Sequence, residues 1–490
     1  MLLGETENWD PQPLRRVLER GGFTQRGLLA LGLEGVPCKG RAGGCMRASL
    51  PPGSPISVLA RLFMLDEEVS ADELLPVFGS ELGPLTELGL LRVTGGAVRS
   101  ALQITPLAEG WFASDFLRLH GEAPEDFVMG LSPVTRMLTS LTPRWQGARM
   151  LELGCGAAWL ALDLRRAGLA VTATDFSHRA LEIAGFNARL NRIEGVEWLQ
   201  GSWFEPVAGR EFDVISCNPP YVQSPGSTLT YRDSAPGAEN PCAHILRHAA
   251  GHLAPGGIAC VVINWSHATP DSWRDAPLAW TPAAGVRRWL FQSKCHGPAE
   301  YAWRWIEHDP LFETTAAARA ELDRWVAHFR QNGIRAVSSG FMIVQRCEPG
   351  AEWTRTDSRD SGEISPDCGE EILRLFANES WLRTTPSDDE VLDASFLVPD
   401  GIRAEIGTKL GNAGWQDRAI RLSSPGRLTY DGQVDENLMR LLEILRKGGT
   451  PRKMVAELRA HPEFAAKPNL EPQIAGLVRE LARYALISRR

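Results

Sequence analysis

The segment Asn218-Pro219-Pro220-Tyr221 combines residue types that could hold a nitrogen atom for a reaction. Consecutive prolines donate no backbone hydrogen bond and keep the chain stiff, so the segment offers acceptors without neighbouring donors. The Asn218 side-chain carbonyl and the Pro219 backbone carbonyl can both accept from an –NH₂ group. That would turn the nitrogen lone pair toward a methyl sulfonium, in a transfer governed by positioning. The Tyr221 ring can stack on a planar amide or base. The competing interpretation is a Pro-rich loop that only ends a strand.

A second group of residues could bind a nucleoside. Gly154 and Gly156 lie in the segment Glu-Leu-Gly-Cys-Gly-Ala at 152–157, which follows an apolar stretch and opens a helix. Glycines there let the backbone approach a ligand, and the helix start presents free N–H groups. Asp175 comes 21 residues after Gly154, where an acidic side chain can bind both ribose hydroxyls. A tight β–α turn and capping of the helix that begins near Ser177 are the competing roles. NAD and S-adenosylmethionine sites share these features, and the Asn218 segment favours S-adenosylmethionine.

Elements that could position these residues lie between residues 149 and 257, where apolar strands alternate with amphipathic helices. That alternation is typical of a parallel βαβ sheet. We expect strands at 150–153, 170–174, 212–217 and 258–263, and helices at 157–167, 177–191 and 312–332. A final pair of strands is expected at 334–345, turning at Ser339-Gly340.

The flanks of this region predict further domains. Residues 1–120 show three short helices and a hairpin, the layout of a winged helix, with Ser70 and Glu73 as a capping box. A central α/β domain that contains this sheet is expected at 121–347 and a polar linker at 348–371. A C-terminal domain with a winged-helix-like end is expected at 372–490. Its part from residue 435 onward has 11 Lys and Arg against 7 Asp and Glu.

The segment GSWFEPVAGREFDVISCNPPYV at 201–222 resembles release-factor glutamine N5-methyltransferases. It is also similar to the wider small-domain methyltransferases, which include ribosomal-RNA guanine N2-methyltransferases. The resemblance covers roughly residues 145–265 and implies an α/β fold, a seven-stranded Rossmann-like class I sheet. It implies catalytic roles for Asn218, Pro219, Pro220 and Tyr221. It implies S-adenosyl-L-methionine binding by the following residues: Glu152, Gly154, Cys155, Gly156, Asp175, Phe176, Ser202, Trp203 and Asn218.

The flanks resemble another set of bacterial methyltransferases over most of residues 55–346. Three segments carry that likeness: Tyr231-Arg232-Asp233, Asn264-Trp265 and Pro298-Ala299-Glu300-Tyr301. Two departures from the release-factor enzymes stand out. Ser202 occupies a position where relatives commonly carry an acidic residue that binds the adenine amino group. The N-terminal helical domain of those enzymes is absent, and a winged-helix-like unit and a long C-terminal extension are expected in its place.

Composition narrows the class of protein. The net charge of −8 argues against a surface that grips nucleic acid as a whole. The nine cysteines are sparse, and Cys38 and Cys45 form their one close pair, so we expect free thiols in a cytoplasmic protein. We expect no signal peptide, since the N-terminal segment carries acidic residues and no apolar core. We expect no membrane span, since an apolar run of ~18 residues does not occur.

Two side-chain clusters have competing interpretations. His244, His248 and His252 share a helix face that could bind a metal, but the opposite face is the apolar one, so we expect solvated histidines and no metal. Six tryptophans follow the strand at 258–263, and we expect most of them in the core or at domain interfaces, with one or two near Trp265 walling the substrate pocket. They are Trp265, Trp273, Trp280, Trp289, Trp303 and Trp305.

The sequence therefore predicts an S-adenosylmethionine-dependent N-methyltransferase that acts on an amide or amine nitrogen of a protein or peptide. One alternative is a nucleobase exocyclic amine in RNA, with phosphate contacts from the basic C-terminal domain. Another is an amine on a small metabolite. An interaction protein that keeps the fold as a scaffold would be expected to have lost the cofactor loop, and Gly154, Gly156, Asp175 and Asn218 are all intact.

Overall fold

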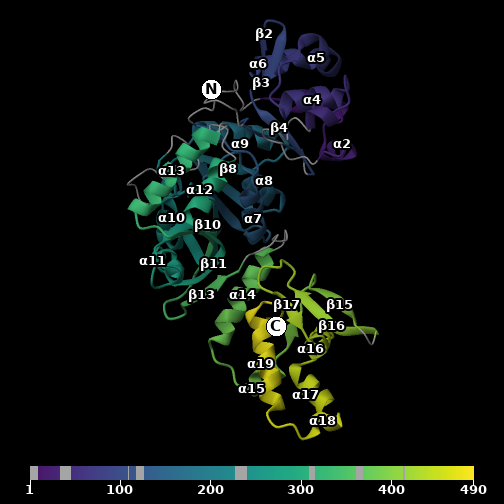
Figure 1. Cartoon of the computed structure of the whole chain (residues 1–490), viewed down its shortest axis with the longest axis vertical. Coiled ribbons are helices and arrows are strands. Elements are labelled where there is room, and N and C mark those ends of the chain that lie inside the picture. The colour runs from purple at the N-terminus through teal and green to yellow at the C-terminus, as the bar shows by residue number, and fades with distance from the viewer. Residues whose placement is uncertain are drawn as a thin grey trace.

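The computed structural model describes residues 9–33, 46–108, 110–116, 126–226, 240–307, 315–359, 368–411 and 414–490. The chain forms three units along its long axis, with the N-terminal and C-terminal units at opposite ends of a central sheet (Figure 1). Cys38, Cys45 and the segment Tyr231-Arg232-Asp233 lie outside the described residues.

The central sheet has eight strands in the order β13-β11-β12-β10-β9-β6-β7-β8. All neighbouring pairs are parallel except those of β12, which runs antiparallel to β10 and β11. This mixed sheet confirms the predicted α/β class. The strands are β6 Arg149–Leu153, β7 Ala170–Asp175, β8 Val196–Gln200, β9 Phe212–Cys217, β10 Leu253–His267, β11 Val286–His296, β12 Ala336–Arg346 and β13 Trp353–Ser358.

Alternate residues of the strands face two apolar layers, as the period of a strand requires. Met150 and Val214 point to the layer that contains α7 Pro133–Leu141, α8 Trp159–Arg166 and α9 His178–Leu190. Leu151 and Ile215, their neighbours, point to the layer that contains α10 Pro241–Ala249. The sheet is therefore buried on both faces and gives its strand ends a rigid base.

The predicted pair of strands around Ser339-Gly340 is wrong, because β12 runs unbroken through both residues. Gly340 lies opposite Gln292, beside an irregularity in β11. A Cβ atom at Gly340 would come within 1.9 Å of the Phe291 carbonyl oxygen. The glycine is thus required for a close approach between strands, and not for a turn.

The predicted polar linker at 348–371 is also interrupted. Its residues 353–358 form β13, which pairs in parallel with β11. The predicted seven-stranded sheet therefore gains an eighth strand. The helix α14 Cys368–Leu382 then begins within the same predicted linker.

The N-terminal unit confirms the expected short helices and the hairpin. Its hairpin turns at Gly95 and Gly96, whose φ values are +60° and +86°. Ser70 caps α5 by accepting a hydrogen bond from the amide of Glu73 at 3.3 Å. The elements are α1 Gln12–Arg20, α2 Gln25–Ala30, α4 Pro55–Phe63, β1 Val69–Ser70, α5 Ala71–Phe78, α6 Leu82–Glu87, β2 Leu91–Thr94, β3 Ala97–Ser100, β4 Gln103–Leu107 and β5 Gly110–Ser114.

Two asparagines of α9 join the N-terminal unit to the central sheet. The Asn187 side chain accepts from the Ala113 amide at 2.7 Å and donates to the Ala113 carbonyl at 2.9 Å. The Asn191 side chain does the same with the Trp111 amide and carbonyl, at 3.1 and 2.7 Å. Asn187 and Asn191 lie one turn apart on α9. Their side-chain amides therefore bond the backbone N–H and C=O groups of β5 as a neighbouring strand would.

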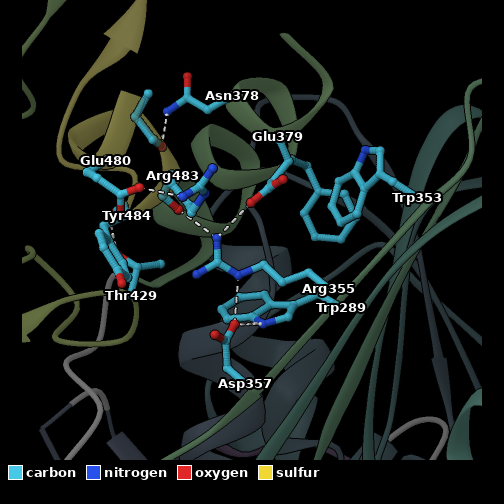
Figure 2. Close-up of polar contacts among 12 residues, drawn as sticks. Trp289, Trp353, Arg355, Asp357, Asn378, Glu379, Thr429, Glu480, Arg483 and Tyr484 are labelled. Carbon is cyan, nitrogen blue, oxygen red and sulfur yellow. Dashed lines mark hydrogen bonds and ion pairs between the residues drawn. The ribbon is translucent and has the colours of Figure 1, made fainter. Parts of the chain in front are cut away.

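Arg355 of β13 joins the sheet to the C-terminal unit (Figure 2). Its guanidinium donates to the Glu379 carboxylate at 3.0 Å and to the Arg483 carbonyl at 2.6 Å. It also donates to Asp357 at 2.7 Å and lies 5.7 Å from the centre of the Trp289 ring. One side chain of the eighth strand thus contacts two helices of the C-terminal unit.

In the C-terminal unit a three-stranded sheet comes before most of the helices. The N-terminal unit has the opposite order, with its hairpin after the helices. The elements after α14 are α15 Asp388–Asp393, β14 Phe396–Leu397, β15 Arg403–Gly411, β16 Gly414–Ser423, β17 Asp431–Val434, α16 Glu436–Arg446, α17 Pro451–Arg459, α18 Pro462–Ala465, α19 Leu470–Arg483 and β18 Ser488–Arg489. Within the described residues, no helix has the length and apolar character to cross a membrane.

Candidate active site

The residues predicted to do chemistry lie at one edge of the central sheet. The strands β8, β7, β6 and β9 are adjacent and parallel, so their carboxyl ends meet at the same edge. The order of the strands reverses between β6 and β9, which is where open α/β sheets bind ligands. We call the residues at the carboxyl ends of β6 and β7 and in the loops after β6, β7 and β8 the cofactor half: Glu152, Gly154, Cys155, Gly156, Asp175, Phe176, Ser202 and Trp203. The segment 218–223 after β9 is the acceptor half.

Asp175 connects the glycine loop to α9. Its Oδ2 atom accepts from the Gly156 amide at 2.8 Å, and its Oδ1 atom accepts from the Ser177 amide at 2.9 Å. Burial raises the pKa of this carboxyl. The Ser177 hydroxyl in turn caps α9 by accepting from the Ala180 amide at 3.2 Å. Asp175 therefore orders the loop and the helix start together, and a carboxylate has enough lone pairs to accept from a ligand as well.

Glu152 holds the other helix of this half. Its Oε2 atom accepts from the Ala161 amide in the first turn of α8 at 2.8 Å. Ala158, which precedes that helix, has φ +65° and an apolar side chain, so Glu152 replaces the usual cap. Burial raises the pKa of Glu152 from 4.5 to about 8.

Cys155 is held in the loop through both its backbone and its side chain, whose Sγ lies 3.8 Å from the Gly156 carbonyl oxygen. Its amide donates to the Thr174 carbonyl at 2.9 Å, and its side chain is buried in the apolar layer beneath the sheet edge. Burial raises the pKa of the thiol well above its usual value. The cofactor role of Cys155 stays a prediction, and in the free protein its thiol is buried and protonated.

The surroundings of the glycine loop fit a nucleoside. Gly154 and Gly156 have φ +66° and +52°, and a Cβ atom at either would meet no other described atom within 4 Å. The loop therefore faces open space. Phe176 leaves 79% of its surface exposed beside Asp175, an apolar face that an aromatic base could cover. Trp203, with φ +46°, follows Ser202 in the loop after β8 and lies 6.4 Å from the His244 ring.

The acceptor half contains an unsatisfied oxygen. The Asn218 Oδ1 atom is buried and has no hydrogen-bond partner among the residues that the structure describes. Pro219 is buried, and Tyr221 is half-buried with its ring between the apolar clusters of the sheet. Burial raises the pKa of the Tyr221 phenol. Since a buried acceptor without a donor costs about 1–3 kcal/mol, this arrangement suits a polar ligand that brings an N–H group.

Two contacts of the acceptor half were missed by sequence reasoning. The Gln223 amide donates to the Tyr301 hydroxyl at 3.2 Å, and that hydroxyl donates to the Asn264 side chain at 3.2 Å. Asn264 and Tyr301 belong to two of the segments that carry the flanking resemblance. Their spacing along the chain gave no sign that they meet.

Trp265 lies in the core, as expected for most of the tryptophans, and the three histidines contact other groups of the chain. Trp265 is 1% exposed and donates through its indole N–H to the Trp273 carbonyl at 2.7 Å, so it is a core residue. Trp289 is likewise buried, next to the C-terminal unit. The His248 ring contacts the His244 carbonyl at 2.8 Å, and His252 stacks on Phe204.

Comparison with known proteins places this site in a family. Residues 130–275 match the model of the methyltransferase small domain, and residues 373–489 match a domain of unknown function (DUF7782). A release factor glutamine methyltransferase of Aliivibrio fischeri is 37% identical over 131 residues, covering 24% of this chain and 46% of the relative. Its counterpart in Xylella fastidiosa is 35% identical over 144 residues, covering 29% and 49%.

The chain therefore spans about half the length of the curated relatives it matches. Among solved structures, a SAM-dependent methyltransferase from Thiobacillus denitrificans with S-adenosyl-L-homocysteine is 16% identical and covers 46% of this chain and 94% of its own, with a TM-score of 0.27. At that TM-score the likeness adds nothing to the evidence of strand order and motif. The central region of this chain, residues 130–275, is a class I methyltransferase domain of the small-domain family.

Proposed function

We propose that this protein is an S-adenosylmethionine-dependent N-methyltransferase whose acceptor is an amide or amine nitrogen of a protein or peptide. A glutamine side-chain amide is the first choice, because the curated relatives are named release factor glutamine methyltransferases. Those relatives match only the central domain, so the two flanking units are free to select a different polypeptide.

The observation that carries this proposal is the Asn218 carbonyl oxygen, buried and without a donor in the described part of the chain. A primary amide has two N–H groups and can give one to Asn218 Oδ1 and the other to the Pro219 carbonyl. Both bonds lie in the plane of the amide, so they fix the direction of the nitrogen lone pair, which is perpendicular to that plane. The rigid prolines keep the two acceptors at a fixed separation.

The cofactor half supports S-adenosylmethionine as the methyl donor. Asp175 would bind the ribose hydroxyls, the Gly154 and Gly156 backbone would lie against the methionine portion, and Phe176 would cover the adenine. When bound, the cofactor supplies an electrophilic methyl group on a sulfonium. Asn218 and Pro219 then act by orientation, which enzymes convert into large rate enhancements. The N–CH₃ bond would form as the S–CH₃ bond breaks, S-adenosylhomocysteine would be released, and the nitrogen proton would then pass to water.

The flanking units are proposed to hold the polypeptide. In the N-terminal unit the order α4-β1-α5-α6-β2-β3, with the sheet order β1-β3-β2, supports a winged-helix fold. The overall charge of −8 favours a polypeptide over a polyanion as the partner of these surfaces. The C-terminal unit is proposed to have a winged-helix-like end and to hold the polypeptide as well.

Labelled S-adenosylmethionine tests the proposal. The full chain is incubated with separated protein and RNA fractions, and the labelled products are identified by mass spectrometry. We expect a label of one methyl group on a glutamine, or on another amide or amine nitrogen, of a protein. An Asn218→Ala chain serves as the control and should leave the same fraction unlabelled. Label confined to RNA or to small molecules contradicts the proposed acceptor.

A further inference from the structure

The Tyr301 hydroxyl lies between the acceptor half of the site and the centre of the sheet. It accepts from the Gln223 amide and donates to the Asn264 side-chain oxygen, both at 3.2 Å. Tyr301 and Asn264 are each 3% exposed. A phenol has one proton to donate, so these two bonds give the hydroxyl a defined direction.

Asn264 provides a rigid reference for this bridge. It lies within β10, between β9 and β12, and is paired with Ser339 of β12. Strands at the centre of a buried sheet are among the parts of a protein that open least. A group hydrogen-bonded to Asn264 is therefore fixed relative to the sheet itself.

The ring of Tyr301 is held from the other side by the helices between β11 and β12. Tyr301 belongs to α12 Pro298–Ile306, and its ring centre lies 6.1 Å from those of Trp325 and Phe329 in α13 Thr315–Gln331. Val222, next to Tyr221 in the chain, is buried in the same apolar cluster. Arg324 of α13 also donates to the Gly226 carbonyl at 3.4 Å. The end of the acceptor half, and the residues that follow it as far as Gly226, thus contact α12 and α13.

We propose that Tyr301 is a positioning residue for methyl transfer. It fixes the backbone at Gln223 relative to β10, and through the stiff Pro219-Pro220 pair this keeps the Asn218 carbonyl aimed at the acceptor nitrogen. This inference rests on the proposed function for the identity of the reaction, and on the two hydrogen bonds for the geometry.

The test replaces Tyr301 by phenylalanine in the full chain, which keeps the ring and removes the hydroxyl. Hydrogen exchange at the Gln223 amide should become about tenfold faster or more, the change that corresponds to losing a bond worth about 1.4 kcal/mol. Exchange of the β9 amides should stay unchanged. With the labelled protein acceptor, kcat should fall about tenfold, since small misplacements at the reacting atoms are costly. KM and the affinity for S-adenosylhomocysteine should stay within about twofold.

Tyr430→Phe is the matched control, because its hydroxyl also bonds a carbonyl at 3.2 Å, that of Gln433 in the C-terminal unit. It should change neither kcat nor Gln223 exchange. Unchanged Gln223 exchange in Tyr301→Phe overturns the inference whatever the reaction is. Faster exchange with wild-type kcat overturns the positioning role. If the wild-type chain methylates no amide or amine of a protein, the proposed function fails, while the exchange result still decides whether Tyr301 fixes this loop.

Discussion

In the cofactor half of the site, the carboxylates of Glu152 and Asp175 already accept hydrogen bonds from backbone amides. In the acceptor half, the Asn218 oxygen has no such donor within the described residues. The hydrogen bonds of these two carboxylates lie within a short stretch of chain, residues 152–177, whereas the acceptor half depends on residues as far away as Tyr301. Changes in the cofactor half should therefore affect folding and binding together, and changes in the acceptor half should affect turnover alone.

Asn218→Ala is the sharpest test of this difference between the two halves. Turnover should fall ~10²-fold or more, because the acceptor nitrogen loses its orientation. Cofactor affinity should stay nearly the same, and the free energy of unfolding should not decrease, because Oδ1 forms no bond with any described residue. Steady-state kinetics, calorimetry with S-adenosylhomocysteine and urea unfolding measure the three quantities.

Asn332→Ala is the matched control for that experiment, since Asn332 is an exposed asparagine that bonds the His328 carbonyl at the end of α13. It should leave turnover intact. Wild-type turnover in Asn218→Ala would show that this loop does not orient the nitrogen, and an oxygen or carbon acceptor would become the better hypothesis. Asn218→Asp refines the comparison, because it keeps the acceptor and adds a negative charge that should favour the cationic cofactor over the transition state.

Asp175→Ala should produce the next largest effect, and it should lower both cofactor affinity and the free energy of unfolding. The Gly156 and Ser177 amides lose their acceptor, and the ribose loses a binding partner. We expect cofactor binding to weaken by ~1–3 kcal/mol and the free energy of unfolding to fall by a similar amount. Asp271→Ala, at an exposed aspartate, is the control. A variant with full stability but weaker binding would mean that Asp175 serves the ligand alone.

Glu152→Gln should change how stability depends on pH. The pKa of Glu152 is raised in the folded chain from 4.5 to about 8, so its contribution to stability is fully present below about pH 4.5 and is lost as the pH rises through 8. Glutamine can still accept from the Ala161 amide but does not titrate. Within that window, the free energy of unfolding of the variant should therefore rise relative to that of the wild type by up to about 1.4 kcal/mol per pH unit. Parallel unfolding curves from pH 5 to pH 9 would contradict the raised pKa.

The smallest effect is expected for Ser177→Ala, which removes the cap of α9. The free energy of unfolding should fall by about 1 kcal/mol, with kcat unchanged. Ser140→Ala, which removes a hydroxyl that bonds a carbonyl of its own helix, should change little. A loss of kcat in Ser177→Ala would show that the two halves are coupled more closely than their hydrogen bonds indicate.

The sequence allowed the cofactor half to be predicted because its signals are local. The bounds predicted for β9 are those observed, and β6 and β7 differ from theirs by one residue. The bridge from Gln223 to Tyr301 could not be predicted, since 78 residues separate the two groups and neither belongs to a periodic pattern. The segment of β13 is polar enough to suggest a linker, and only Trp353, which is buried, indicates otherwise.

The eighth strand also bears on the order in which the chain can fold. β11 is synthesised before β12 and β13, and its outer edge has a partner only once residues 353–358 are available. Until then a strand containing Trp289 and Phe291 presents unpaired backbone groups, the condition under which sheets join edge to edge. A chain shortened after Cys347 would keep the other seven strands of the central sheet, β6 to β12, and retain that open edge permanently. Aggregation of such a chain would reflect an unfinished sheet, even with every residue of the candidate site in place.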